Sequence, residues 1–221
     1  MFQIKICGIT SVKDAQWSAL AGADAIGLNF YEESKRFISP DAAEAIVKAI
    51  PPRVVKVGLF VNTPVNEIEQ IAQRLGLDLI QLHGDEPPEM IAELAERDVL
   101  RAFRCSDNGF TQISEYLDHC RTATRLPSAL LLDAHKPGQY GGTGEVIDWS
   151  LLAESREMFA GLPLVLAGGL TPFNVAEAIA AVRPTAVDTA TGVERAPGQK
   201  DPMLLRAFVS AAKKAFAALN P

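Results

Sequence analysis

The chain alternates short apolar runs with longer amphipathic stretches from one end to the other. The apolar runs predict eight strands, over residues 3–7, 25–29, 54–61, 79–82, 100–104, 129–133, 164–167 and 186–189. The stretches between them have helical periodicity, as in 64–75, where apolar residues recur three and four positions apart. Strands that alternate with helices form a parallel sheet, whose two faces must both be covered.

Eight strand–helix units predict a closed (β/α)8 barrel, the TIM-barrel fold. Divided by eight, 221 residues give about 28 per unit, which suits a βαβ repeat with brief loops. An open doubly wound sheet is the alternative, but eight continuous aliphatic strands favour closure. No linker or change of composition interrupts the pattern, so we expect a single α/β domain over residues 1–221.

Helix starts and long loops follow from turn-forming residues. Thr63, Thr171 and Asp201 are each followed by proline, and we expect each to begin a helix as its N-cap. The longest irregular segments, 30–40, 134–147 and 190–200, follow the second, sixth and eighth predicted strands. Loops of this length in a compact domain are often functional.

Composition excludes several classes of partner. The net charge of −6 comes without a basic stripe, which argues against nucleic acid or an anionic membrane surface. No apolar stretch is long enough to span a membrane, and the N-terminus has no export signal. Three widely spaced cysteines, Cys7, Cys105 and Cys120, indicate neither a disulfide framework nor a zinc site. We expect a cytoplasmic protein, and both monomer and homodimer remain open.

Strand ends are where a barrel of this kind assembles its active site. Cys7 ends the first predicted strand and Asp133 the sixth, so a thiol and a carboxyl group are expected on one rim. Such a pair can abstract and donate protons in an isomerisation. The simpler interpretations are that Cys7 is a small buried apolar residue and Asp133 a helix cap. The strand-end positions favour the catalytic interpretation more strongly for Asp133.

Glycine turns follow the last two predicted strands. Gly168 and Gly169 come after the seventh, and Thr191 and Gly192 after the eighth. Backbone amides in such turns bind phosphate, although glycine also serves any tight turn. Arg36, after the second strand, is either a clamp for a substrate carboxylate or a solvated surface residue.

Histidine positions do not predict a metal site. His83 follows the fourth strand as a candidate base or ligand, but His119 and His135 fall in a helix and a loop. The glycine-rich segment 137–144 does not match a nucleotide-binding loop and is expected to cover the site as a mobile lid.

Several of these motifs occur in one known order. Residues 5–10, 81–84, 132–133, 166–170, 187–188 and 192–194, with 34–36 and 197–201, resemble the phosphoribosylanthranilate isomerase family over essentially the whole chain. The resemblance implies the Amadori rearrangement of N-(5-phosphoribosyl)anthranilate in tryptophan formation, a small phosphorylated substrate and no cofactor.

The same resemblance implies residue roles. Asp133 would protonate the ring oxygen of the sugar, and Cys7, as a thiolate, would remove the C2′ proton. Either Lys5 or nearby amide dipoles would help to form that thiolate. Arg36 would hold the anthranilate carboxylate. The remaining substrate-binding residues would be His83, Gly168, Gly169, Ala190, Thr191 and Gly192. Ala190 stands where the family commonly has a serine, which puts phosphate affinity in doubt rather than the type of reaction.

Three other functions compete with this interpretation. A related histidine-pathway isomerase catalyses an analogous rearrangement but has aspartate where Cys7 stands. An epimerase acting on ribulose phosphate would need metal-binding histidines at the strand ends. A phosphate-ligand binder without catalysis is the third, and the presence of both Cys7 and Asp133 counts against it.

Overall fold

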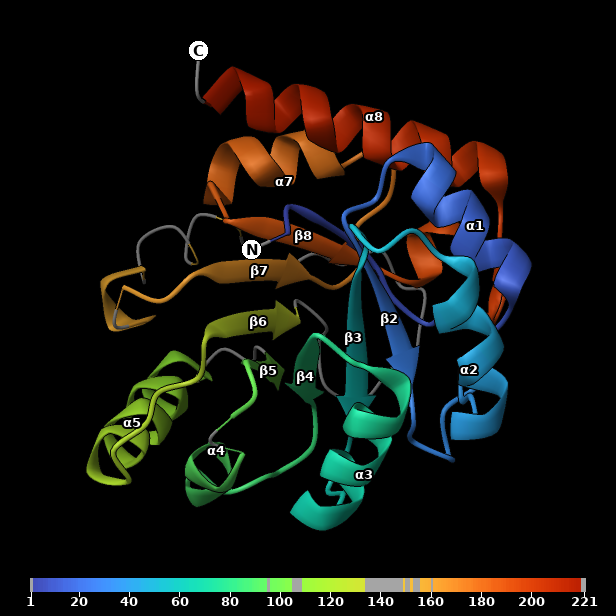
Figure 1. The fold of residues 1–221 in the computed structure, drawn as a ribbon. Coiled ribbons are helices and arrows are strands. Elements are labelled where there is room, and N and C mark those ends of the chain that lie inside the picture. The colour runs from blue at the N-terminus through green and yellow to red at the C-terminus, as the bar shows by residue number, and fades with distance from the viewer. Residues whose placement is uncertain are drawn as a thin grey trace.

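The eight predicted strands form a closed parallel barrel in the computed structural model, which describes residues 2–94, 96–104, 109–133, 149, 152, 156–159 and 161–219. Neighbours in the barrel follow the chain order from β1 to β8, and β1 pairs with β8 to close it (Figure 1). The strands are β1 (Ile4–Ile6), β2 (Ala25–Asn29), β3 (Val55–Phe60), β4 (Leu79–Leu82), β5 (Val99–Arg104), β6 (Ala129–Asp133), β7 (Leu164–Ala167) and β8 (Ala186–Thr189).

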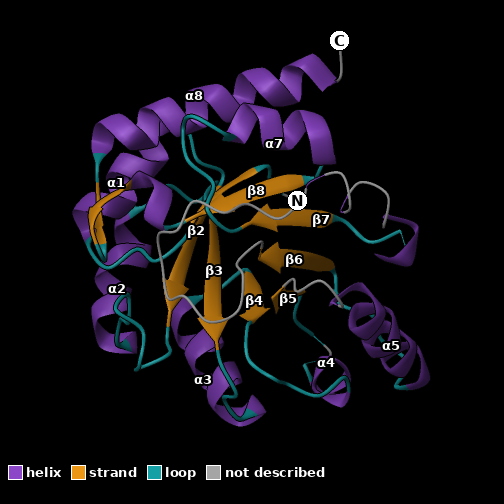
Figure 2. Cartoon of the chain, turned by 180° about the vertical axis from the view of Figure 1, so that it is seen from behind, coloured by secondary structure: helices purple, strands orange, loops and turns teal. Residues whose placement is uncertain are grey.

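Helices surround the strands in both views (Figures 1 and 2). They are α1 (Val12–Ala21), α2 (Pro40–Ala49), α3 (Val65–Leu75), α4 (Glu89–Glu93), α5 (Gly109–Thr122), α7 (Val175–Val182) and α8 (Pro202–Leu219), with a 3-10 turn η1 (Arg156–Phe159) before β7. None of the described helices is long and apolar enough to cross a membrane.

The strand predictions are confirmed closely. The bounds of β2, β4, β6, β7 and β8 are those predicted, and the other three differ by one residue at one or both ends. The reason is that aliphatic residues continue through each strand and stop where the chain turns. Closure is confirmed as well, since the parallel pairs form a complete ring rather than an open sheet.

Two local predictions are wrong. The Thr63 hydroxyl donates to the Val61 carbonyl, so Thr63 is not the N-cap of α3, which begins after Pro64. Thr171 does not cap α7 directly, because Asn174 precedes that helix and its side-chain oxygen accepts from the Thr171 amide. In both cases the hydroxyl or amide stabilises the turn before the helix instead.

The segment after β8 is more ordered than a loop. It contains a 3-10 turn, η2 (Thr191–Val193), and an antiparallel pair of short strands, β9 (Glu194–Ala196) and β10 (Gln199–Lys200). This pair leads directly into α8, so the residues after the last barrel strand are held by backbone hydrogen bonds.

Along each strand, every second residue faces the barrel interior and the residues between them face the helices. Val57, Leu100, Leu131 and Val165 belong to a buried cluster inside the barrel. Leu82, Leu132 and Leu166 belong to a second cluster shared with the helices. This alternation turns Asp133, the last residue of β6, toward the barrel interior, and with it Cys7 and His83, which directly follow β1 and β4.

The interior also contains a buried ion pair. Lys5 of β1 and Asp188 of β8 are register partners, and Lys5 Nζ lies 2.8 Å from Asp188 Oδ2. Lys5 is completely buried and Asp188 is 6% exposed. A charged group at this depth is unfavourable unless an opposite charge pairs with it. Removing either residue would therefore leave the other as an unpaired buried charge.

Asp201 confirms the predicted start of α8, since its carboxylate accepts from the amides of Met203 and Leu204 and Pro202 is the first helical residue. We expect Asp201→Ala to lower the free energy of unfolding by about 1 kcal/mol, the usual value of an N-cap. Urea denaturation measures this, with Ser210→Ala on the exposed face of α8 as control. A loss no greater than that of the control would contradict the capping role.

Candidate active site

Cys7 lies at the mouth of the barrel, directly after β1. Its amide donates to the Thr189 carbonyl at 2.8 Å, which ties it to the end of β8, and it is 8% exposed. Gly27 of β2 makes room for the thiol, because a Cβ at that position would lie 2.7 Å from Cys7 Sγ. The thiol therefore occupies a fixed place that any larger residue at position 27 would disturb.

The charges beside Cys7 act in opposite directions on its protonation. Burial raises the pKa of the Cys7 thiol above its ordinary value, Lys5 opposes this, and Asp188 adds to it. Burial lowers the pKa of Lys5, but Asp188 and Cys7 together raise it above its ordinary value. The result is a mostly neutral thiol next to a fully charged ammonium group, which would favour the thiolate once a proton is lost.

Asp133 is the last residue of β6. It has the same orientation as Ala129 and Leu131, the residues of this strand that face the barrel interior. Its carboxylate Oδ2 lies 3.8 Å from His83 Nε2, and its side chain is 27% exposed. Since β6 is three strands from β1 around the ring, Asp133 and Cys7 approach the mouth from different directions. The predicted acid and base thus share one rim.

His83 is neutral in this setting. Burial and the charges of Arg104, Lys5 and Arg101 lower its pKa from 6.5 to about 4. The His83 Nδ1 atom lies 3.2 Å from Nε2 of the Gln81 side-chain amide. With the Gln81 amide in this orientation Nδ1 accepts, so the ring proton sits on Nε2, toward Asp133.

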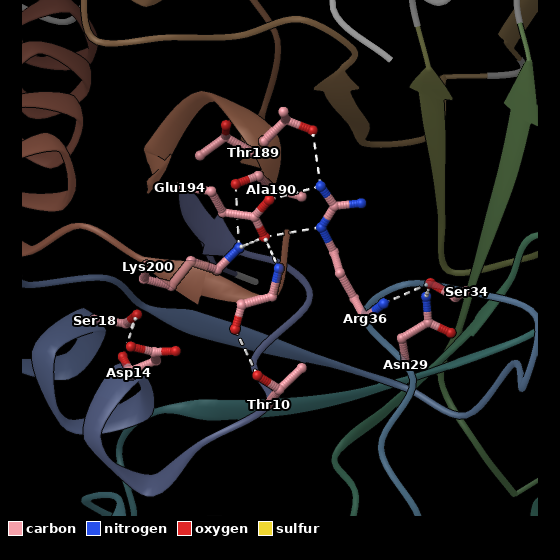
Figure 3. A network of polar contacts seen from close by, with 12 residues as sticks. Thr10, Asp14, Ser18, Asn29, Ser34, Arg36, Thr189, Ala190, Glu194 and Lys200 are labelled. Atoms are coloured by element: carbon pink, nitrogen blue, oxygen red, sulfur yellow. Dashed lines mark hydrogen bonds and ion pairs between the residues drawn. The ribbon is translucent and has the colours of Figure 1, made fainter. Parts of the chain in front are cut away.

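Arg36 lies on the loop after β2, and its guanidinium is bound by the carboxylate of Glu194. Its Nε and Nη2 donate to the two oxygens of Glu194 at 2.8 and 2.6 Å, and Nη2 also donates to the Thr191 hydroxyl at 3.1 Å (Figure 3). The hydrogen bond to Glu194 raises the pKa of Arg36, so the guanidinium stays charged.

The turns after β7 and β8 are packed against each other. Gly168 and Gly169 both have positive φ, at 89° and 64°. A Cβ on Gly192 would lie 1.9 Å from the Leu170 carbonyl oxygen, which also accepts from the Thr189 hydroxyl. Only glycine fits at 192, and this close packing places the two predicted phosphate-binding turns side by side.

The structure therefore brings together the predicted residues in two groups. Cys7, Arg36 and the turn containing Ala190, Thr191 and Gly192 lie on the β1, β2 and β8 side. His83 and Asp133 lie on the β4 and β6 side. Cys105, His135 and the proposed lid 137–144 lie outside the described residues.

Glu194 and Lys200 are the site residues that sequence reasoning missed. Lys200 Nζ lies 2.9 Å from Glu194 Oε1 and 3.1 Å from the Ala190 carbonyl oxygen (Figure 3). Burial lowers the pKa of Lys200. Burial alone would raise the pKa of Glu194, but Arg36 and Lys200 lower it. Glu194 falls in the motif 192–194 and Lys200 in the motif 197–201. Their opposite charges, six positions apart, were the available signal that the two residues form an ion pair.

Comparison with known proteins decides the family. A family model described as N-(5′-phosphoribosyl)anthranilate (PRA) isomerase matches residues 4–211. A relative of that name from Geobacter metallireducens is 47% identical over 213 residues, covering 96% of this chain and 100% of the relative. The chain belongs to the phosphoribosylanthranilate isomerase family. It is accordingly an isomerase of tryptophan biosynthesis.

Solved structures agree with this family in fold. The crystal structure of phosphoribosylanthranilate isomerase from Thermotoga maritima has a TM-score of 0.87 and 41% identity, covering 97% of this chain and 100% of that one. Another, with TM-score 0.83 and 39% identity over the same shares, is a complex with reduced 1-(o-carboxyphenylamino)-1-deoxyribulose 5-phosphate. A third concerns monomers generated from the dimeric Thermotoga maritima isomerase, with TM-score 0.81, 38% identity and coverage of 96% and 99%.

The lowered pKa of His83 in this isomerase has a consequence for stability. Between pH 6.5 and about 4 the unfolded chain binds a proton at this position that the folded chain does not, so stability falls as pH falls. We expect His83→Gln to remove up to about 3 kcal/mol of this pH dependence. Urea denaturation across that range measures it, with His119→Gln on the exposed face of α5 as control. Parallel curves for wild type and His83→Gln would contradict the assignment.

Proposed function

We propose that this isomerase converts N-(5-phosphoribosyl)anthranilate to 1-(2-carboxyphenylamino)-1-deoxyribulose 5-phosphate with Asp133 as the acid and Cys7 as the base. One observation carries the assignment of roles: a carboxyl ends β6 and a thiol directly follows β1, both at interior-facing positions of the same closed barrel. Functional groups of TIM barrels are placed at this end of the strands.

The first step opens the sugar ring. Asp133 gives a proton to the ring oxygen, the bond between C1′ and that oxygen breaks, and the lone pair of the anilino nitrogen forms a C=N⁺ bond to C1′. Asp133 is suited to this step because it ends its strand partly exposed and faces the mouth. His83, neutral and with Nε2 toward Asp133, would orient the substrate hydroxyls without taking the proton.

The second step moves a proton from carbon. The Cys7 thiolate takes the C2′ proton, the C2′–H electrons form a C1′=C2′ bond, and the iminium electrons return to nitrogen. The resulting enolamine gains a proton at C1′ and loses the 2′-hydroxyl proton, which leaves the C2′ ketone. Atoms and electrons balance within the substrate, so oxidation at C2′ is matched by reduction at C1′. Lys5 would stabilise the thiolate through its charge.

Two further contacts would hold the substrate. Arg36 would bind the aryl carboxylate, and the backbone amides around Gly168, Gly169, Ala190, Thr191 and Gly192 would bind the phosphate. The half-buried Ala190 supplies backbone only, so the missing hydroxyl is expected to weaken phosphate binding modestly. The substrate sugar would then lie between the thiol and the carboxyl.

We also propose that the isomerase works in the cytoplasm, as a monomer or a homodimer. Cys7 and Cys120 are free thiols, and a thiol base must stay reduced to act.

Cys7→Ala tests the base. We expect kcat to fall about 10²- to 10⁴-fold with the fold intact, because no other thiol ends a barrel strand at the mouth among the described residues. In the wild type kcat/KM should rise with pH toward the raised pKa of the Cys7 thiol, because only the deprotonated form is active. Consumption of fresh phosphoribosylanthranilate, followed by fluorescence, measures both. Cys120→Ala is the control, and wild-type kcat in Cys7→Ala would overturn the assignment.

Asp133→Asn tests the acid. Asparagine keeps the shape of the side chain but cannot supply the ring-opening proton at neutral pH, so kcat should fall by a similar factor of about 10² or more. Asp118→Asn, at an exposed position of α5, is the matched control. An unchanged kcat in Asp133→Asn would exclude Asp133 as the acid. A well-folded wild type that leaves the substrate unconsumed would instead favour a non-catalytic binder.

A further inference from the structure

Glu194 is the centre of a polar network that joins three separate segments at the barrel mouth. Its carboxylate accepts from Arg36 of the β2 loop and from Lys200 of β10. Oε1 also accepts from the Gly198 amide at 3.3 Å, and the Gly198 carbonyl accepts from the Thr10 hydroxyl at 2.6 Å. Figure 3 shows these side chains converging from different elements. One side chain thus couples the loops after β1, β2 and β8.

The orientation of Arg36 depends on this carboxylate. Glu194 occupies the Nε and Nη2 edge of the guanidinium with two hydrogen bonds, a geometry that fixes the plane of the group. In Figure 3 the third nitrogen, Nη1, points away from Glu194. Within the described part of the chain Nη1 has no hydrogen-bond partner, so this nitrogen is the one presented to a ligand.

Lys200 extends the network to the turn after β8. Its completely buried ammonium group bridges Glu194 Oε1 and the Ala190 carbonyl oxygen. Ala190 immediately precedes η2, whose Thr191 hydroxyl accepts from Arg36. The backbone of the proposed phosphate-binding turn and the guanidinium of Arg36 are therefore both held by the same carboxylate.

Charge and burial agree with a role in binding an anion. The Glu194 side chain is 3% exposed and that of Arg36 is 23% exposed. Two cations and one anion leave the cluster with one net positive charge. A buried carboxylate between two cations keeps both in place while leaving that charge for the substrate, which has anionic groups at both ends.

We propose that Glu194 is a positioning residue for the substrate. It presents Nη1 of Arg36 to the aryl carboxylate, and through Lys200 it fixes the turn that binds the phosphate. This inference rests on the proposed function, since it takes Arg36 and the turn as the binding groups. If Glu194 helps to bind the substrate equally in the ground state and in the transition state, replacing it should raise KM and leave kcat nearly constant.

The test compares Glu194→Asp and Glu194→Gln with the wild type. Aspartate keeps the charge between Arg36 and Lys200, so this variant folds, but it is too short to bond both. We expect KM for phosphoribosylanthranilate to rise roughly tenfold, with kcat within about twofold of the wild type. Glutamine keeps the length without the charge, and its effect on KM should be larger. Glu32→Gln, exposed on the same loop as Arg36, is the matched control.

A second measurement separates positioning from general loosening of the fold. Calorimetry with the reduced product, with and without its aryl carboxylate, should show that Glu194→Asp weakens the carboxylated ligand more. In an Arg36→Met background this extra loss should disappear, because Arg36 transmits it.

Each outcome has a distinct meaning. Unchanged KM in both Glu194 variants of an active enzyme would overturn the inference and leave the proposed function standing. So would equal weakening of the two ligands or a fall in kcat with KM unchanged. A folded wild type without turnover would overturn both proposals. If Glu194→Gln fails to fold, Glu194→Asp alone decides.

Discussion

Closure of the barrel between β1 and β8 is the constraint on which the site depends. Lys5 and Asp188 meet at this seam, 183 positions apart in sequence, as a completely buried ammonium and a nearly buried carboxylate. Because each would be strongly unfavourable alone in the interior, their pairing requires β1 and β8 to adopt this register. The same register places the Cys7 amide against the Thr189 carbonyl and brings the thiol next to the turn after β8.

Further paired charges lie between this seam and the barrel mouth. Lys5 lies under Cys7, Lys200 lies between the Ala190 carbonyl and Glu194, and Glu194 holds Arg36. Each of Lys5, Lys200 and Arg36 has a carboxylate partner, so these polar groups are oriented before a ligand arrives. Such preorganisation is the main means by which enzymes stabilise developing charge. Here the paired charges lie on both sides of the proposed base, beside the residues proposed to bind the carboxylate and the phosphate.

Much of this could be predicted from the sequence, because strands and their ends have a local signal. Aliphatic runs marked each end of the barrel strands to within one residue, and the residues at the strand ends led to the proposal for Cys7 and Asp133, which stays a prediction. Thr63 was misassigned because its hydroxyl can bond the turn as well as the helix, and only the turn geometry decides. Glu194 and Lys200 received no role because their contacts join residues up to 158 positions apart, across elements that look irregular in sequence.

The central claim is that Asp133 and Cys7 act in separate steps, ring opening and then proton removal from C2′. Ring opening and closure alone interconvert the two anomers at C1′. The most direct test is to follow anomer exchange in substrate labelled with carbon-13 at C1′ by magnetic resonance, in Cys7→Ala and Asp133→Asn. The account predicts exchange above the uncatalysed rate in Cys7→Ala and none above it in Asp133→Asn. Equal loss of exchange in both variants would contradict the separation of roles.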